Sequence, residues 1–296
     1  MLTAFLGLFG ISPPAYASRV SAFGPSLHLM SHRGGSLEHI ENTLTAFRHT
    51  SRLATASILE MDLAMTKDGH VVVFHDNDLV RMCAVNGRIE DLEWKDLPLL
   101  VVPPVLFGKV DLGSKEARRI PLFEDVLKAC PGVPMTIDVK RGSEEMIIKV
   151  GKLIQKYKRE RITLWGSFRD SQIQLCRKHF GDSIPTYFSR KRVLQSFILS
   201  FLGLTRWMSY KESALIIPNR WYLLRPKWFE DLNKVGIAVL VWGDKKDVGE
   251  GPGGGINTIE GFERIRKSGA NGICTDNPTL LQEWLKDHPM VKMDRF

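Results

Sequence analysis

Residues 59–76 read LEMDLAMTKDGHVVVFHD and contain parts of two strand-like runs separated by a short gap. After Ser57, the first run, 57–63, is apolar except for Glu60 and Asp62, and the second, 71–75, ends in His75. Side chains at positions i and i+2 of a strand point to the same face, so Glu60 and Asp62 share one face. The gap is too short for a helical crossover, which predicts that one of the two runs is a hairpin arm or an irregular segment.

On both sides of this stretch, strand-like runs alternate with helical patterns, as in parallel sheets whose strands are joined by helices. The strand-like runs are 28–32, 57–63, 71–75, 134–139, 161–165, 184–188, 213–217, 237–242 and 271–274. The helical patterns lie near 42–54, 121–130, 143–158, 169–179, 225–235, 258–268 and 278–287. The pattern predicts an α/β fold, a TIM (β/α)8 barrel that uses eight of the nine runs.

The expected domain organisation is one barrel, residues 27–290, preceded by an apolar segment, residues 1–26. Residues 76–120 contain Pro98, Pro103 and Pro104 and no sustained periodicity, which predicts an insertion after the third strand-like run. The apolar run at the start of the chain is shorter than the ~20 residues that span a bilayer, and it ends before Pro13. A short membrane anchor and a signal-like segment are both consistent with it.

Composition and charge narrow the classes of partner. The 41 basic and 33 acidic residues give a net charge of +8, which favours phosphate-bearing ligands or a membrane surface. The basic residues are scattered and no nucleic-acid-binding signature is found, so nucleic acid is not an expected partner. Cys83, Cys130, Cys176 and Cys274 are far apart in the sequence, which predicts reduced, buried thiols.

Polar residues that can carry chemistry gather where strand-like runs end. His32 ends the run 28–32 and Arg33 follows it, Glu60 and Asp62 lie in the run 57–63, and His75 closes the run 71–75. Barrel enzymes carry their catalytic groups at the carboxyl ends of the strands. Two histidines that flank a carboxylate pair suit a general base and a general acid acting on opposite sides of a phosphorus centre.

Asp138 interrupts the apolar run MTIDV, and Lys140 follows on the same face. A buried charge is costly unless it is paired or bound to a metal, so Asp138 requires an explanation. One interpretation is a structural network of Asp138 with Lys140 or an arginine. The other is a three-carboxylate site for Ca²⁺ or Mg²⁺ formed by Glu60, Asp62 and Asp138.

Two further stretches have more than one interpretation. Residues 190–210 combine a basic start with an apolar run, as an outer helix of the barrel does, or as an interfacial helix at anionic lipid headgroups does. The GxGxxG pattern at 249–254 is separated from its strand and contains Pro252, which argues against a dinucleotide site and for a loop over the active-site face.

Together, HRGG at 32–35, ENT at 41–43, residues 59–76, IDVK at 137–140 and ICTDNP at 273–278 resemble the glycerophosphodiester phosphodiesterase family, whose fold is a TIM barrel. The segments at 165–167, 193–204 and 239–242 resemble the membrane-associated lysophospholipase D branch of that family. The resemblance extends over roughly residues 28–285. Asp138 is a departure, since most members of the family carry Glu at this position.

The resemblance implies a divalent cation, Ca²⁺ or Mg²⁺, and a role for each of eight residues. The metal ligands are Glu60, Asp62 and Asp138, the catalytic acid and base are His32 and His75, the phosphate contacts are Arg33 and Lys140, and Trp242 lines the substrate site. Which histidine acts as the base stays open at this point.

The expected function is metal-dependent hydrolysis of lysophospholipids to lysophosphatidic acid and a headgroup alcohol, at an endoplasmic reticulum or other endomembrane. One alternative is hydrolysis of soluble glycerophosphodiesters to glycerol 3-phosphate, with a cytoplasmic location. Another is a barrel that binds lipid or phosphate without turnover.

Overall fold

The computed structural model describes residues 23, 27–53, 57–108, 115–243 and 254–293 of the chain. All of the predicted segment 1–26 except Phe23 lies outside these residues, as does the 249–254 pattern apart from Gly254. Within the described residues, no helix has both the length and the apolar character needed to cross a membrane.

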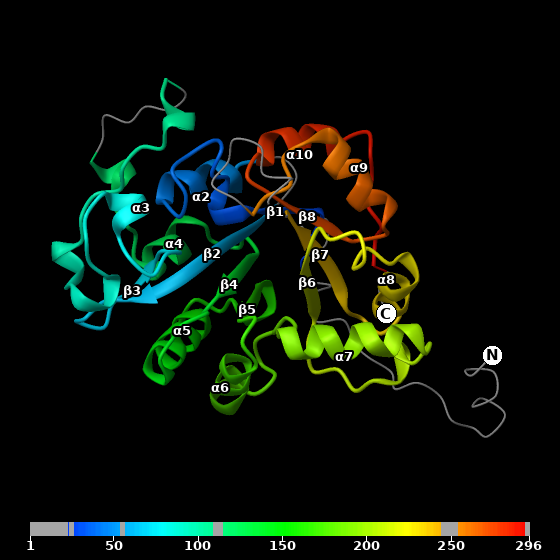
Figure 1. Ribbon diagram of the computed structural model, residues 1–296. Helices are drawn as coiled ribbons and strands as arrows, with labels where there is room; N and C mark the ends of the chain where they lie inside the picture. The colour runs from blue at the N-terminus through cyan, green and yellow to red at the C-terminus, as the bar shows by residue number, and fades with distance from the viewer. Residues whose placement is uncertain (1–22, 24–26, 54–56, 109–114, 244–253, 294–296) are drawn as a thin grey trace.

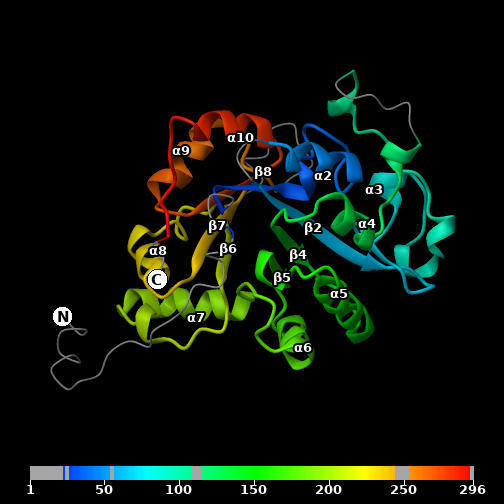
Figure 2. The same cartoon turned by 180° about the vertical axis from the view of Figure 1, so that it is seen from behind.

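Seven parallel strands form most of a closed barrel with helices outside it, as the two opposite views show (Figures 1 and 2). The order of the strands around the barrel is β5-β4-β2-β1-β8-β7-β6. Their bounds are β1 Leu29–Ser31, β2 Ile58–Met65, β4 Met135–Asp138, β5 Thr163–Gly166, β6 Ala214–Pro218, β7 Ala238–Trp242 and β8 Gly272–Thr275. The predicted TIM barrel is therefore confirmed.

The eighth position of the barrel is filled by single bridges rather than by a regular strand. Between β5 and β6, Thr186 pairs with Trp165 and Tyr187 pairs with Ala214, both in parallel. The run 184–188 was predicted as a full strand and is shorter than that, because Pro185 has no N–H to donate and contributes only its carbonyl, to the Trp165 N–H.

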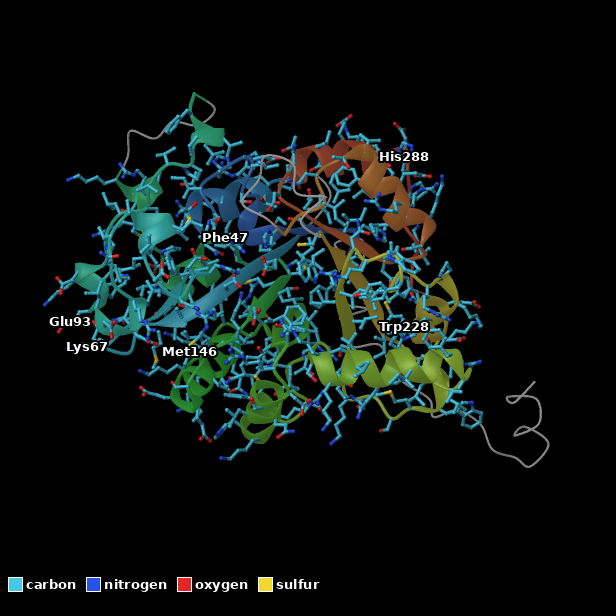
Figure 3. The ribbon with its side chains drawn as sticks, in the orientation of Figure 1. Phe47, Lys67, Glu93, Met146, Trp228 and His288 are labelled. Atoms are coloured by element: carbon cyan, nitrogen blue, oxygen red, sulfur yellow. The ribbon has the colours of Figure 1, made fainter. Side chains whose placement is uncertain are left out.

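The predicted hairpin arm is β3, Val71–Val73, which pairs antiparallel with the outer half of β2. The turn between them uses Gly69 at φ 81°, in the left-handed region that favours glycine. At the far end of this arm Lys67 and Glu93 lie close together, because the Lys67 N–H donates to the Leu92 carbonyl (Figure 3).

Most of the barrel strands are followed by outer helices whose apolar faces cover them. The helices are α2 Leu44–Ser51, α4 Phe123–Ala129, α5 Glu144–Lys156, α6 Asp170–Phe180, α7 Arg190–Phe201, α8 Pro226–Asn233, α9 Ile259–Lys267 and α10 Pro278–Leu285. In α5, Ser143 caps the first turn by accepting from the Met146 N–H, and the side chains of Met146, Ile147 and Val150 are buried. This is the amphipathic pattern that packs a helix on a sheet.

Within 76–120, the described residues 76–108 and 115–120 form α3, Val80–Cys83, and a series of short 3₁₀ helices. These are Ile89–Asp91, Trp94–Asp96, Pro104–Leu106 and Glu116–Arg118. Leu79, Met82, Leu100 and Leu106 of this connection pack with Val72 of β3 in a separate buried cluster. The connection is thus anchored on the β2–β3 arm at one side of the barrel (Figure 1).

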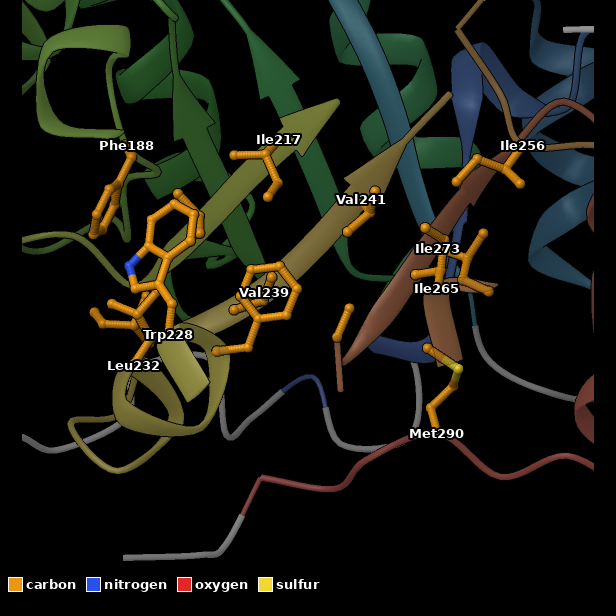
Figure 4. Close-up of a cluster of buried hydrophobic side chains, with 14 of the residues drawn as sticks. Phe188, Ile217, Trp228, Leu232, Val239, Val241, Ile256, Ile265, Ile273 and Met290 are labelled. Atoms are coloured by element: carbon orange, nitrogen blue, oxygen red, sulfur yellow. The ribbon is translucent and has the colours of Figure 1, made fainter. Parts of the chain in front are cut away.

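Alternation along the strands separates the core into an inner and an outer set. Side chains from several strands form the cluster inside the barrel, among them Met30, Ile58, Leu164, Tyr187, Ile216, Leu240 and Cys274. The other side chains pack against the helices, as in the cluster around Trp228, Val239 and Ile273 (Figure 4). Because Ile58 points inward, Glu60 and Asp62 of the same strand also point inward, nearer its carboxyl end.

All four cysteines are free and buried, as predicted: Cys83, Cys130, Cys176 and Cys274.

The stability of the barrel depends on the outer cluster, and replacing Phe229 tests this. Phe229 is fully buried, whereas Phe107 is 63% exposed. We expect Phe229→Ala to lower the free energy of unfolding by about 3–5 kcal/mol and Phe107→Ala to change it by less than about 0.5 kcal/mol. Chemical denaturation measures both values, and equal effects of the two substitutions would contradict the assignment of the core.

Candidate active site

A cavity of about 170 Å³ opens at the carboxyl ends of the barrel strands. Its lining includes all eight residues singled out from the sequence: His32, Arg33, Glu60, Asp62, His75, Asp138, Lys140 and Trp242. The structure therefore brings together residues that are as much as 210 positions apart in the chain.

The turn after β1 aims His32 and Arg33 into this cavity. Arg33 has φ 52°, and Gly34 and Gly35 have φ 83° and 96°, so three successive residues take the left-handed conformation. A Cβ atom on Gly34 would lie 2.9 Å from the Cβ of Ala46, and one on Gly35 would lie 2.8 Å from the ring of Pro278. Only glycine fits both positions, which explains the HRGG pattern.

His32 is held by a carboxylate that the sequence reasoning did not assign. Nδ1 of His32 lies 2.7 Å from Oδ1 of the buried Asp276, at the carboxyl end of β8. Asp276 also accepts hydrogen bonds from the hydroxyl of Ser36, the N–H of Gly255 and the amide of Asn257. Asp276 thus orients the imidazole, and Nε2 is the ring nitrogen left for a ligand.

Asp276 also sets the proton affinity of His32. Burial lowers the pKa of His32, but the negative charge of Asp276 and its hydrogen bond outweigh burial, so the pKa of His32 lies above its ordinary value. Asp276 follows the strand run ICT in the sequence. The argument applied to Asp138, that a carboxylate in an apolar strand needs a partner, would have singled it out.

His75, which follows β3, is held in the same manner. Its Nδ1 lies 2.6 Å from Oδ1 of Asp76, and the N–H of Phe74 donates to the carbonyl of Asp62. Burial lowers the pKa of His75 more than Asp76 and Asp62 raise it. The cavity therefore contains two imidazoles, each fixed through Nδ1 by an aspartate, with pKa values shifted in opposite directions.

The carboxylates share the cavity with two cations. Asp62 and Asp138 are directly paired in the register of β2 and β4. Nζ of Lys140 lies 2.7 Å from Oδ1 of Asp62 and 3.7 Å from Oδ2 of Asp138, and Nε of Arg33 lies 3.7 Å from Oδ2 of Asp62. The structural network considered from the sequence is therefore present, although Lys140 lies nearer to Asp62 than to Asp138.

These charges separate the proton affinities of the carboxylates. Burial raises the pKa of Asp138 to about 7, with the charges of Asp62 and Glu60 adding to it and Lys140 opposing it. Asp62 is also buried, but the charge of Lys140 holds the pKa of this carboxyl well below its usual range.

The donor set fits a hard divalent cation. Oδ2 of Asp62 and Oδ1 of Asp138 are buried with no hydrogen-bond partner among the described residues, and Glu60 lies on the same inward face. Unpaired buried carboxylate oxygens are costly, and Ca²⁺ and Mg²⁺ bind this kind of oxygen. In the described part of the chain, no group of three or more acidic, histidine or cysteine side chains is arranged so that it could hold a metal ion. Lys140 instead lies close to two of the three carboxylates, Asp62 and Asp138.

An aromatic wall lines another part of the cavity. Phe168, Tyr187 and Trp242 belong to it, and the rings of Phe168 and Tyr187 are 5.6 Å apart. Nε1 of Trp242 is buried without an acceptor within the described ranges, so it is available to a polar group of a ligand.

Comparison with known proteins identifies a family and several similar proteins. The model of the glycerophosphoryl diester phosphodiesterase family matches residues 32–280. Human lysophospholipase D GDPD1 is 33% identical over 287 residues, which cover 86% of this chain and 85% of that protein. Human lysophospholipase D GDPD3 is 27% identical over 310 residues, covering 96% of this chain and 93% of that protein.

Solved structures show the same fold. A phosphodiesterase from Oleispira antarctica, determined in complex with the product sn-glycerol-3-phosphate, aligns with a TM-score of 0.67 and 19% identity. The alignment covers 90% of this chain and 99% of that one.

The contact between Asp276 and His32 predicts the effect of Asp276→Asn. The substitution removes the charge that raises the pKa of His32, so we expect this pKa to fall by about one to two units. An NMR titration of the histidine ring signals measures it, with the His32 signal identified by its loss in His32→Gln. Asp287→Asn, at an exposed position after α10, is the control and should leave the pKa of His32 unchanged. An unaltered pKa of His32 in Asp276→Asn would show that the two side chains do not interact in solution.

Proposed function

Because the chain belongs to the glycerophosphoryl diester phosphodiesterase family, we propose that it hydrolyses lysophospholipids to lysophosphatidic acid and a headgroup alcohol, using a divalent cation, Ca²⁺ or Mg²⁺. The observation that carries the reaction type is the pair of aspartate-held histidines beside Arg33, Lys140 and three carboxylates. The names of the relatives, lysophospholipase D, support the choice of substrate.

His32 and His75 exchange protons with the two oxygens that change bonding at phosphorus. One imidazole takes the proton of the attacking hydroxyl through Nε2, and the other gives a proton to the leaving alcohol. A free glycerol hydroxyl next to the ester is the proposed nucleophile, so that a cyclic phosphate forms first and water opens it. This route explains a preference for lyso substrates, in which that hydroxyl is unesterified.

Arg33 and Lys140 bind the phosphate and offset the negative charge that builds up during the reaction. Bound by Glu60, Asp62 and Asp138, a divalent cation would polarise a phosphoryl oxygen and lower the pKa of the attacking hydroxyl. Lys140 can then leave the carboxylates and face the phosphate. Trp242 lines the side of the cavity where the glycerol or the headgroup lies.

The surface of α7 supports a lipid substrate. Val193 and Phe197 pack against the barrel cluster, so α7 is an outer helix, yet apolar side chains next to this packed face are exposed. We call Leu194, Ile198, Phe201 and Leu202 the α7 surface, and they are 59%, 53%, 59% and 62% exposed. Such a patch marks an interaction site, and its basic neighbours Arg190 and Lys191 suit anionic headgroups.

The loop after β6 also exposes an aromatic side chain and places an arginine beside the α7 surface. Its Arg225 guanidinium stacks 3.8 Å from the ring centroid of Phe201, and the loop also carries Trp221, which is 82% exposed. Tryptophan favours the boundary between water and lipid. We therefore propose that the α7 surface and this loop contact a membrane from which the lysophospholipid is taken.

Two alternatives make different predictions. If the apolar surface does not bind lipid, soluble glycerophosphodiesters are the substrate class, because the cavity chemistry is the same. A barrel that binds phosphate without turnover is disfavoured, since every acid, base and ligand position carries a chemically competent side chain.

The proposal predicts release of choline from lysophosphatidylcholine that stops in EDTA and returns with Ca²⁺ or Mg²⁺. Glycerophosphocholine is assayed beside it. His32→Ala or His75→Ala should lower turnover by at least about 100-fold while substrate affinity is retained. Turnover of the soluble diester alone would make glycerophosphodiester breakdown the function. Turnover of neither substrate would favour the barrel that binds lipid or phosphate without turnover.

Membrane contact predicts loss of vesicle binding in the double variant Leu194→Glu/Ile198→Glu. Removing two apolar side chains from the bilayer should weaken binding to vesicles of anionic phospholipid by at least about tenfold, measured by sedimentation. Ile259→Glu, at a half-exposed position on α9, is the matched control. Equal binding of the double variant and the wild type would contradict a docking role for α7.

A further inference from the structure

Arg81, in the first turn of α3, is linked through two carboxylates to two residues that line the cavity, although it does not line the cavity itself. Its Nε and Nη2 atoms donate to the two carboxylate oxygens of Asp76, at 2.6 and 3.0 Å. Its Nη1 and Nη2 atoms donate to the two oxygens of Glu41, both at 2.8 Å. One guanidinium thus makes paired hydrogen bonds with two carboxylates, which is the geometry that restrains a carboxylate most strongly.

Each of these carboxylates ends on a residue of the site. Oδ1 of Asp76 lies 2.6 Å from Nδ1 of His75. Oε1 of Glu41 accepts from Nη1 of Arg33 at 2.8 Å. A continuous chain of hydrogen bonds therefore runs from the imidazole of His75 through Arg81 to the guanidinium of Arg33.

Burial makes Glu41 dependent on its partners. Glu41 and Arg33 are only 3% and 5% exposed. Burial alone would raise the pKa of Glu41, but the hydrogen bonds and charges of Arg81 and Arg33 outweigh it and lower that pKa. Without Arg81, the partners left among the described residues would be one cation for Glu41 and the imidazole of His75 for Asp76.

Packing alone does not account for Arg81. Its own side chain is 40% exposed, so its ion pair with Asp76 contributes little to stability, whereas its hydrogen bonds to the buried Glu41 also stabilise the fold. It lies in the 76–120 connection, whose attachment to the barrel is provided by the apolar cluster on β3. What Arg81 restrains is the position of the two carboxylates that hold His75 and Arg33.

We propose that Arg81 is a positioning residue. It fixes Asp76 so that Nε2 of His75 faces the reacting phosphate, and it fixes Glu41 so that the guanidinium of Arg33 faces the same phosphate. In this role the 76–120 connection completes the active site. The inference rests on the proposed function for its catalytic consequence, but the positioning of His75 can be measured without turnover.

The first test is the pKa of His75, determined by NMR titration in the full chain with Mg²⁺ present. Besides Asp76, the charged groups that act on His75 are Asp62, Arg33 and Lys140, and these are left unchanged. Arg81→Met leaves the charge of Asp76 unshared, which stabilises the imidazolium, so the pKa of His75 should rise by about one unit. Arg81→Lys should restore part of the difference.

A double-variant test separates this role from a general structural one. If Arg81 acts through Asp76, Arg81→Met should no longer raise the pKa of His75 when Asp76 is already Asn. Arg88→Met is the matched control, because Arg88 lies in the same connection and pairs only with the exposed Glu90 among the described residues. It should leave the pKa of His75 unchanged.

The second test is kinetic. Arg81→Met should lower kcat by about 10–100-fold, as loss of residues that orient catalytic groups does. It should also lower the melting temperature below that of Arg88→Met, because the buried Glu41 loses one of its two cations. An unchanged pKa of His75 together with a lower melting temperature would overturn the proposal, because Arg81 would then act only on the stability of the fold. If the wild type hydrolyses neither diester, the proposed function fails, while the titration still decides whether Arg81 positions His75.

Discussion

The ion pair between Lys140 and Asp62, 2.7 Å apart at the ends of neighbouring strands, shows the constraint under which this barrel mouth is built. Moving a charge from water into a protein interior costs several kcal/mol, and the cost is offset only by close partners of opposite sign. Asp62, Asp138 and Asp276 are all buried here, and each has a cation or a histidine beside it. In this arrangement a divalent cation can take the place of Lys140 and Arg33 beside the carboxylates, and a phosphate can take the place of the carboxylates beside Lys140 and Arg33.

The barrel places these buried charges in one layer, where each lies next to a partner of opposite sign. Alternation along β2 points Ile58 inward below and the carboxylates of Glu60 and Asp62 inward above, and the charged layer lies on a packed floor that includes Met30 and Ile216. The left-handed turn at Arg33 and the two glycines after it bring the imidazole and guanidinium over that layer. Fold and chemistry therefore depend on the same few strand ends.

Much of this could be predicted from the sequence, because strand periodicity and polar residues at strand ends are local signals. The β2–β3 arm followed from the shortness of one gap, and His32, Glu60 and Asp138 followed from their places in apolar runs. The segment at 184–188 was harder, since a proline inside a β-rich run reduced a strand to two bridges. The partners Asp276 and Arg81 were missed for a different reason. Asp276 stands out as a carboxylate at the end of an apolar strand, but its partner His32 lies 244 residues away, and Arg81 meets Glu41 across 40, so no spacing rule identifies these partners.

The central claim is that Glu60, Asp62 and Asp138 hold a divalent cation against a phosphate that His32 and His75 flank. It is tested most directly by a crystal structure of the protein with Mn²⁺ and sn-glycerol 3-phosphate, using anomalous scattering to locate the metal. The account predicts one strong anomalous peak among the three carboxylates, a phosphate oxygen bound to that metal, and Nε2 of both histidines facing the phosphate. Metal bound elsewhere, or a phosphate bound away from the histidines while the three carboxylates remain without a cation, would contradict it.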